Sequence, residues 1–107
     1  MRSLLCNFDF PVTPIIWLRN ALLNLETIHG YYMDQEVPDQ AKKIIKFIEL
    51  TVNQLIQFPG LGRPGRVAKT RELLVSQTPY LIIYREHKNE VQILRVLHSA
   101  QKWPRAD

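Results

Sequence analysis

The hydrophobic pattern of this chain changes its period once, at the segment FPGLGRPG, residues 58–65, where proline and glycine are concentrated. Before this segment, apolar residues recur every three to four positions, as on one face of a helix. After it, they form short runs rich in Val, Ile, Leu and Tyr, as in strands. With 107 residues, 46% of them hydrophobic, the chain is long enough for one core. The pattern therefore predicts a single domain in which helices cover one small sheet.

Two amphipathic helices are predicted in the first half. The apolar positions of the first are Ala21, Leu22, Leu25, Ile28 and Tyr32. Those of the second are Ala41, Ile44, Ile45, Ile48, Val52, Leu55 and Ile56. Pro38 suits the first turn of the second helix, and Pro59 with Gly60 ends it. Because the connection between the two is short, they are expected to form an antiparallel hairpin.

Four strands complete the predicted fold. One is the run IIWL before the first helix, and three more lie in residues 71–76, 80–86 and 90–98, where they form an antiparallel meander. The fold class is therefore α+β with the order β-α-α-β-β-β, a helical hairpin packed on a small, mainly antiparallel sheet. Residues 15–107 are assigned to this domain, and residues 1–14, which have no convincing pattern, to an N-terminal extension of uncertain structure.

Positive charge is concentrated in the second half of the chain. The net charge is +4, but residues 1–57 hold five basic and six acidic side chains, whereas residues 58–107 hold nine basic and four acidic ones. This asymmetry favours an acidic partner, either nucleic acid or an acidic protein segment, although an ordinary solvated surface would look the same. The lone Cys6 excludes an internal disulfide, and no signal peptide or membrane span is apparent, so a cytoplasmic location is expected.

Enzymatic chemistry has one candidate centre. The glycine-rich segment follows a helix and not a strand, which argues against a phosphate loop. The histidines are too scattered to predict a metal site, and no cofactor is expected. General acid–base cleavage of RNA remains open, with His98 as the titrating group. Phosphate binding in that reaction would fall to Arg63, Arg66, Lys69, Arg71 and Arg95. The alternative is that His98 simply ends the last strand.

Residues 70–104, TRELLVSQTPYLIIYREHKNEVQILRVLHSAQKWP, resemble the C-terminal half of the RelE/ParE superfamily of toxins from type II toxin–antitoxin systems. IIWLRNALLNLETIHGYY is similar to the first strand and helix of that family, and PDQAKKIIKFIELTVNQLIQFPGLGRPGR to its second helix and following loop. The combination of FPxLGRPGR, REL, PYxIxYR and VLHxAQxWP is specific as an ensemble. The resemblance implies the same β-α-α-β-β-β order and a growth-arresting toxin of a plasmid-stabilisation module.

The resemblance to the RelE-like branch implies a ribosome-dependent mRNA endoribonuclease that polarises the scissile phosphate with basic residues. The matching positions here are Glu72, Leu74, Leu81 and the neighbourhood of Gln101, and none of these is basic. A leucine cannot stabilise developing charge on a phosphate, and a glutamate repels it. Some relatives use a histidine near the end of the last strand, so His98, with Arg95 and Arg71, stays a candidate catalytic set for this alternative.

The ending RVLHSAQKWP is closer to the ParE-like branch, which implies a non-enzymatic poison of DNA gyrase. A basic, partly aromatic surface would dock on the target. The candidate target-binding residues are Arg63, Arg66, Lys69, Arg71, His98, Lys102 and Trp103. Trp103 has a second interpretation, in which it covers the open end of the core. An inert copy that still binds its antitoxin is a further alternative.

The resemblance also implies a cognate antitoxin and a hetero-oligomer with it. Antitoxins of these operons wrap an acidic or amphipathic segment around the toxin, and such a segment folds on binding. The candidate antitoxin-binding residues are Phe47, Leu50 and Ile56 on the second helix, beside Arg71. Equally, the first three are ordinary core residues on a wide helical stripe.

Overall fold

The computed structural model describes residues 13–99, which form two helices and a five-stranded sheet. The elements follow in the order β1 (Ile15–Trp17), α1 (Arg19–Asp34), α2 (Pro38–Asn53), the 3₁₀ helix η2 (Gln54–Ile56), β2 (Arg63–Pro64), β3 (Arg71–Leu74), β4 (Tyr80–His87) and β5 (Glu90–His98). The predicted α+β class and the order of the main elements are confirmed.

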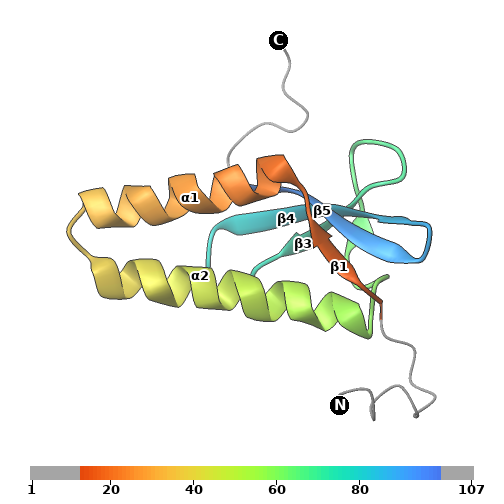
Figure 1. Cartoon of the computed structure of the whole chain (residues 1–107), viewed down its shortest axis with the longest axis horizontal. Helices are drawn as coiled ribbons and strands as arrows, with labels where there is room; N and C mark the ends of the chain where they lie inside the picture. Colours follow the sequence, from red (N-terminus) through yellow and green to blue (C-terminus); the bar gives the residue numbers. More distant parts are fainter. Residues whose placement is uncertain (1–12, 100–107) are drawn as a thin grey trace.

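The helices form the predicted antiparallel hairpin (Figure 1). Each buries part of the stripe that its period predicts: α1 buries Ala21 and Ile28, and α2 buries Ala41, Ile44, Ile48 and Val52, whereas Leu22 of the predicted α1 stripe is exposed. Pro38 stands at the start of α2, where its missing N–H costs no intrahelical hydrogen bond, and Asp39 lies near the positive end of the helix dipole. The connection takes only three residues, 35–37, which holds the two helices side by side.

The strands lie in the order β1-β5-β4-β3-β2, so β4 and β5 are interior strands, as their continuous apolar runs predict. β1 runs parallel to β5, and every other neighbouring pair is antiparallel. β5 contains a bulge: Ile83 pairs with Arg95 and Tyr84 with Ile93, so Leu94 is the extra residue. This bulge changes which side chains of β5 face the helices.

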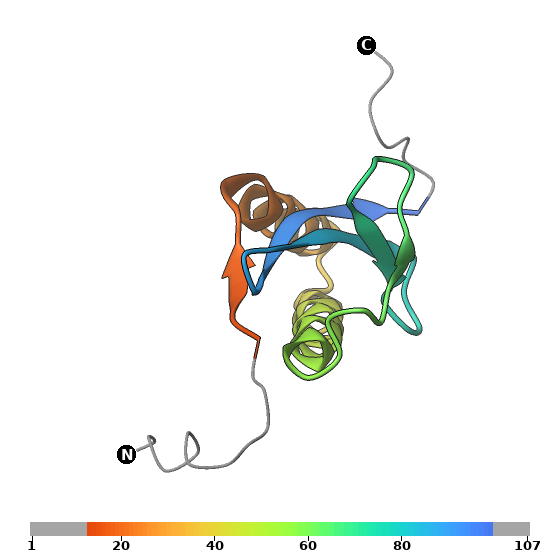
Figure 2. The ribbon, with the colours of Figure 1, turned by 90° about the vertical axis from the view of Figure 1, so that its right-hand side faces the viewer.

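The sheet has apolar side chains on both faces. On the helix-facing side, Ile82, Tyr84, Ile93 and Val96 join the helical residues in the main core. On the other side, a second cluster consists of Leu81, Ile83 and Leu97 with Leu94 against them. The loop that leads from β2 into β3 rises on that second side, away from α2 (Figure 2).

The sequence analysis missed β2, because a two-residue strand has no detectable period. Arg63 and Pro64 pair with Glu72 and Arg71 at the edge of the sheet, where the missing N–H of proline is tolerated. Residues 1–12 of the predicted extension lie outside the described residues; the Thr13 N–H donates to the Ile56 carbonyl. As far as residues 13–99 are concerned, neither helix is long and apolar enough to cross a membrane.

Candidate functional site

Residues 60–71 hold four basic side chains, and a buried glutamate contacts two of them; we call residues 60–71 the basic loop. Glu72 follows it on β3 and is only 3% exposed. Its Oε1 lies 3.2 Å from Arg63 Nη2, and its Oε2 lies 3.6 Å from Arg66 Nε. The Arg66 backbone N–H also donates to Oε2 at 3.1 Å. One carboxylate therefore orients two arginines and one turn of backbone.

Tyr84 on β4 holds the start of the basic loop in place. Its hydroxyl donates to the Pro59 carbonyl at 2.8 Å and accepts the Gly62 N–H at 2.8 Å. A Cβ at Gly62 would lie 2.8 Å from that hydroxyl and 2.9 Å from the Glu72 carbonyl, so only glycine fits. Burial raises the pKa of Tyr84, against the opposing effects of the Gly62 N–H and the Arg71 charge. The phenol therefore stays neutral at physiological pH and can donate its proton.

Arg71 closes the loop from the other side. Its Nη1 donates to the Gly62 carbonyl at 2.8 Å, and its Nε lies 3.5 Å from Glu86 Oε2. Lys69 sits near the tip with a φ of 67°, in the left-handed region. The backbone of this loop is thus fixed by side-chain contacts before any partner arrives.

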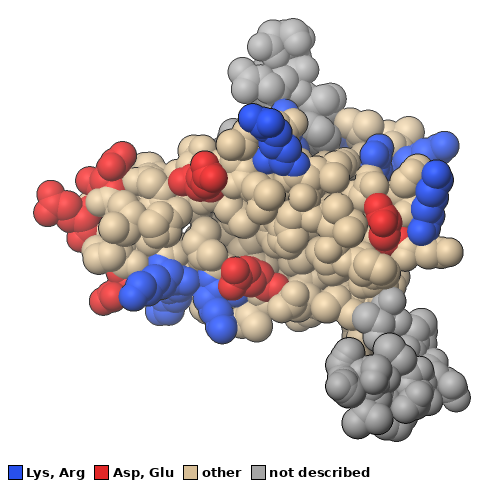
Figure 3. Space-filling model, in the orientation of Figure 1, with Lys and Arg blue, Asp and Glu red and all other residues tan. Residues whose placement is uncertain are grey.

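The arginines that Glu72 orients remain accessible. The side chain of Arg63 is 68% exposed and that of Arg66 is 49% exposed. Figure 3 shows Lys and Arg at the end of the molecule where the basic loop and the β4–β5 hairpin lie, and Asp and Glu over the α1–α2 connection at the other end, where basic side chains of α2 lie beside them. The structure therefore brings together Arg63, Arg66, Lys69 and Arg71, four of the seven predicted target-binding residues. Lys102 and Trp103 lie outside the described residues.

His98, the remaining predicted target-binding residue, lies away from the basic loop. It is opposite Tyr80 on the helix-facing side of the sheet, and its ring packs edge-on against Tyr80 with centroids 5.7 Å apart. Arg95 is opposite Ile83 on the other side. The candidate catalytic set is therefore divided between the two faces of the sheet.

Three of the positions that match the catalytic cations of RNA-cleaving relatives lie within residues 13–99, on the second face, and they are occupied by Glu72, Leu74 and Leu81. Leu74 is opposite Leu81, and Leu81 is opposite Leu97, so a row of leucines crosses three strands. Glu72 lies beside this row, opposite Ile83, and both of its carboxylate oxygens are paired with arginines. The surface is suited to apolar contact rather than to stabilising a phosphate in a transition state.

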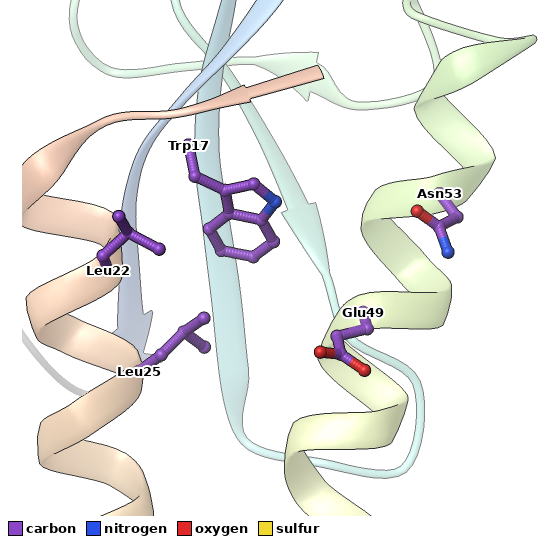
Figure 4. A pocket seen from close by; sticks show the side chains of 5 residues that line it. All are labelled: Trp17, Leu22, Leu25, Glu49 and Asn53. Carbon is purple, nitrogen blue, oxygen red and sulfur yellow. The ribbon is translucent and has the colours of Figure 1, made fainter. Parts of the chain in front are cut away.

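A second candidate site is a groove between the helices, which we call the hairpin groove. It encloses about 350 Å³ and is lined by Trp17, Leu22, Leu25, Glu49 and Asn53. Figure 4 shows the Trp17 indole between the helices, with the leucines on the α1 side and the two polar residues on the α2 side. Leu22 is 47% exposed. An apolar wall with a polar rim fits an amphipathic segment.

The predicted antitoxin-binding residues divide between core and surface. Phe47 is half-buried and packs against the main core, and Ile56 is also half-buried. Leu50 is 50% exposed on α2. Arg71 belongs to the basic loop.

Several residues of the two candidate sites were missed from the sequence. Trp17, Leu22 and Leu25 were assigned to strand and core, yet they line the hairpin groove. The adjacent pair Leu22 and Leu23, which makes the apolar stripe wider than a core needs, was the available signal. Tyr84 was a strand residue without a role, and no local pattern indicates its contact with Gly62.

Known proteins give a consistent result. A family model described as ParE toxin of type II toxin–antitoxin system, parDE, matches residues 15–103. Y4kP of Sinorhizobium fredii (strain NBRC 101917 / NGR234), a protein provisionally named as a toxin, is 41% identical over 90 residues, which are 84% of this chain and 92% of Y4kP. The solved structure of a chromosomal ParDE toxin–antitoxin system from P. aeruginosa superposes with a TM-score of 0.76 at 30% identity, covering 81% of this chain and 96% of the other.

Proposed function

The chain belongs to the ParE toxin family of type II toxin–antitoxin systems, and on that premise we propose that it arrests growth by docking on DNA gyrase, without cleaving RNA itself. The observation that carries the proposal is the row of leucines on the second sheet face, at positions where an RNA-cleaving toxin would need basic residues. The separation of His98 from Arg95 and from the basic loop supports it. Within residues 13–99, the candidate catalytic residues of the nuclease alternative do not come together on one face of the sheet.

The basic loop is the proposed docking surface. Arg63 and Arg66 are exposed but already oriented by Glu72, so little side-chain freedom is lost when a partner binds them. Guanidinium groups pair with carboxylates and phosphates in a planar, bidentate geometry. The target surface is therefore expected to be acidic, as a gyrase subunit or its bound DNA would be. Lys102, Trp103 and His98 stay as further candidates for this contact.

Neutralisation is proposed to come from a cognate antitoxin in the same operon, in the cytoplasm, where gyrase is also found. The hairpin groove is the proposed seat of an amphipathic antitoxin segment, whose apolar side would meet Leu22 and Leu25 and whose polar side would meet Glu49 and Asn53. Exposed Leu50 extends the apolar surface of α2. The toxin would then act as one component of a hetero-oligomer.

The test is a gyrase supercoiling and cleavage-complex assay with purified, antitoxin-free protein. Wild type is expected to accumulate cleaved DNA, and Arg63→Ala/Arg66→Ala to need at least about tenfold more protein for the same effect. Lys42→Ala/Lys43→Ala removes the same charge from exposed positions of α2 and serves as the matched control. No effect of folded wild-type protein on gyrase would overturn the proposal. Equal loss in both double variants would overturn the role of the loop.

A further inference from the structure

An aromatic pocket lies between the C-terminal half of α1 and the paired residues Tyr80 and His98, at the start of β4 and the end of β5. Of its lining, only His98 is among the candidate gyrase contacts named above. It encloses about 380 Å³. Its lining consists of Thr27, Ile28, Tyr31, Tyr32, Tyr80 and His98. Four of these six side chains are aromatic rings, so most of the lining consists of aromatic groups.

The rings are arranged as two perpendicular pairs. Tyr31 and Tyr32 have centroids 5.0 Å apart and planes at 85°, and Tyr80 and His98 have centroids 5.7 Å apart and planes at 80°. The Tyr80 hydroxyl donates to the Tyr32 hydroxyl at 3.3 Å, which joins one pair to the other. Perpendicular rings present walls in more than one direction, and ring faces carry the negative part of the aromatic quadrupole. This is the arrangement by which aromatic cages hold cations.

The electrostatic surroundings also favour a cation. Asp34 follows Thr27 by seven residues and Tyr31 by three, so helical spacing places it on the same side of α1 as the pocket. Tyr31, Tyr32 and Asp34 belong to the end of α1, where the helix dipole is negative, and no basic residue occupies the last turn. Figure 3 shows acidic side chains over the α1–α2 connection, and the basic side chains near them belong to α2, which contributes no residue to the lining of the pocket.

We propose that the aromatic pocket binds the side chain of an arginine that a partner protein presents. A guanidinium is planar and weakly hydrated, so it can stack on a tyrosine face while its N–H groups reach a hydroxyl oxygen and a nearby carboxylate. The pocket and the basic loop share no residue: Tyr80 lines the pocket at the start of β4, and Tyr84, four residues further along, contacts the loop. One partner can therefore contribute a cation here while an acidic surface engages the loop, and the proposal stands independently of gyrase.

The probe is N-acetyl-arginine methylamide, titrated into the full-length protein with two-dimensional NMR as the readout. Shifts are expected to concentrate on Tyr31, Tyr32, Tyr80 and His98, with millimolar affinity for so small a ligand. The citrulline analogue has the same shape without the charge and is expected to bind about tenfold more weakly. The lysine analogue should also bind more weakly, because its ammonium cannot stack.

Two variants within the proposed site and one control on the same helix test its location. Tyr31 is 56% exposed, so Tyr31→Ala should leave the fold intact and abolish the shifts, whereas Leu23→Ala, on another part of the same helix, should leave binding unchanged. Asp34→Asn should weaken binding several-fold. Equal affinity for arginine and citrulline, equal affinity for arginine and lysine, or shifts that survive Tyr31→Ala in a folded protein would each overturn the proposal.

Discussion

Glu72 is the only charged residue within residues 13–99 that is almost completely removed from solvent. Burial of a carboxylate is costly unless cations and N–H donors replace the lost water. Arg63, Arg66 and the Arg66 backbone N–H provide that replacement. The carboxylate thereby joins the stability of β3 to the orientation of the surface arginines, so one residue contributes both to folding and to the proposed docking surface.

Replacement of Glu72 by glutamine should lower the free energy of unfolding by about 1–2 kcal/mol, because the ion pairs are lost while the side-chain shape is kept. The control is Glu86→Gln, which removes an exposed pair with Arg71 and should cost less than about 1 kcal/mol. Thermal unfolding followed by circular dichroism measures both. Equal melting temperatures for the two variants would show that burial of Glu72 contributes nothing.

The raised pKa of Tyr84 predicts that the protein loses stability at alkaline pH. Burial raises its pKa above the ordinary value of 10.0, so the folded protein holds the phenolic proton more tightly than the unfolded chain does. The resulting stabilisation is complete below pH 10 and is lost as pH rises through the folded-state pKa. Urea unfolding between about pH 8 and pH 11 should therefore show a falling free energy.

In Tyr84→Phe the free energy of unfolding should fall less steeply as pH rises. The decrease that remains is expected from Tyr80, whose pKa is also raised by burial and by its hydrogen bond to Tyr32. At pH 8 the same variant should lose about 1–3 kcal/mol, because Pro59 and Gly62 lose their partner. Tyr31→Phe removes a hydroxyl from an exposed ring and is the control. An unchanged pH profile in Tyr84→Phe would contradict the assignment.

At the scale of elements, the basic loop is a rigid connection whose shape depends on close approach of backbone to β3 and β4. Gly62→Ala places a methyl group against the Tyr84 hydroxyl and the Glu72 carbonyl, neither of which can move without breaking a contact. We expect a loss of about 1–3 kcal/mol in chemical unfolding. Gly60→Ala meets no atom within 4 Å and should be neutral. If both alanine variants are equally stable, the loop adjusts more freely than its contacts indicate.

The role of the hairpin groove can be tested with two neighbouring leucines of α1, one inside the groove and one outside it. Leu22 lines the groove, whereas its neighbour Leu23 does not, although the two are 47% and 43% exposed. Leu22→Asp should weaken binding of the cognate antitoxin by more than about tenfold, because a charge would be buried against an apolar segment. Leu23→Asp should change affinity little. Isothermal titration calorimetry measures both, and similar affinities for the two variants would exclude the groove as the antitoxin site.

At the scale of the whole molecule, the basic loop lies at one end, and the other end carries acidic residues over the α1–α2 connection with basic side chains of α2 beside them (Figure 3). Such an arrangement orients an approaching partner over distances of about a Debye length. The molecule therefore presents a different chemistry to partners at each end and an apolar groove between its helices.

Gyrase inhibition should accordingly depend on salt. The concentration of toxin that gives half-maximal cleavage should rise several-fold between about 50 and 200 mM salt, relative to gyrase activity without toxin at each concentration. Arg63→Ala/Arg66→Ala should show a shallower dependence, and Lys42→Ala/Lys43→Ala should follow wild type. Inhibition that does not vary with salt would indicate an apolar docking surface, with Leu74 and Leu81 as the first residues to replace.

Sequence alone determined the two helices, the three strands of the meander, the interior position of β4 and β5 and the basic character of residues 63–71, because period and charge are local properties. The two-residue β2 has no period and exists only through its pairing with β3. The hairpin groove likewise needed β1 and both helices in place before Trp17 could line it.

The tertiary structure also decided where His98 points. Strict alternation along β5 from Val91 and Ile93 would place Arg95 and Leu97 on the helix-facing side and His98 on the other. The bulge at Leu94 reverses this, so that Val96 and His98 face the helices and Arg95 faces away. A bulge arises from the register between two strands, which no run of residues in one strand encodes. The same histidine that the sequence offered as a catalyst beside arginines is therefore part of an aromatic pocket, because one extra residue in β5 turned it to the other face.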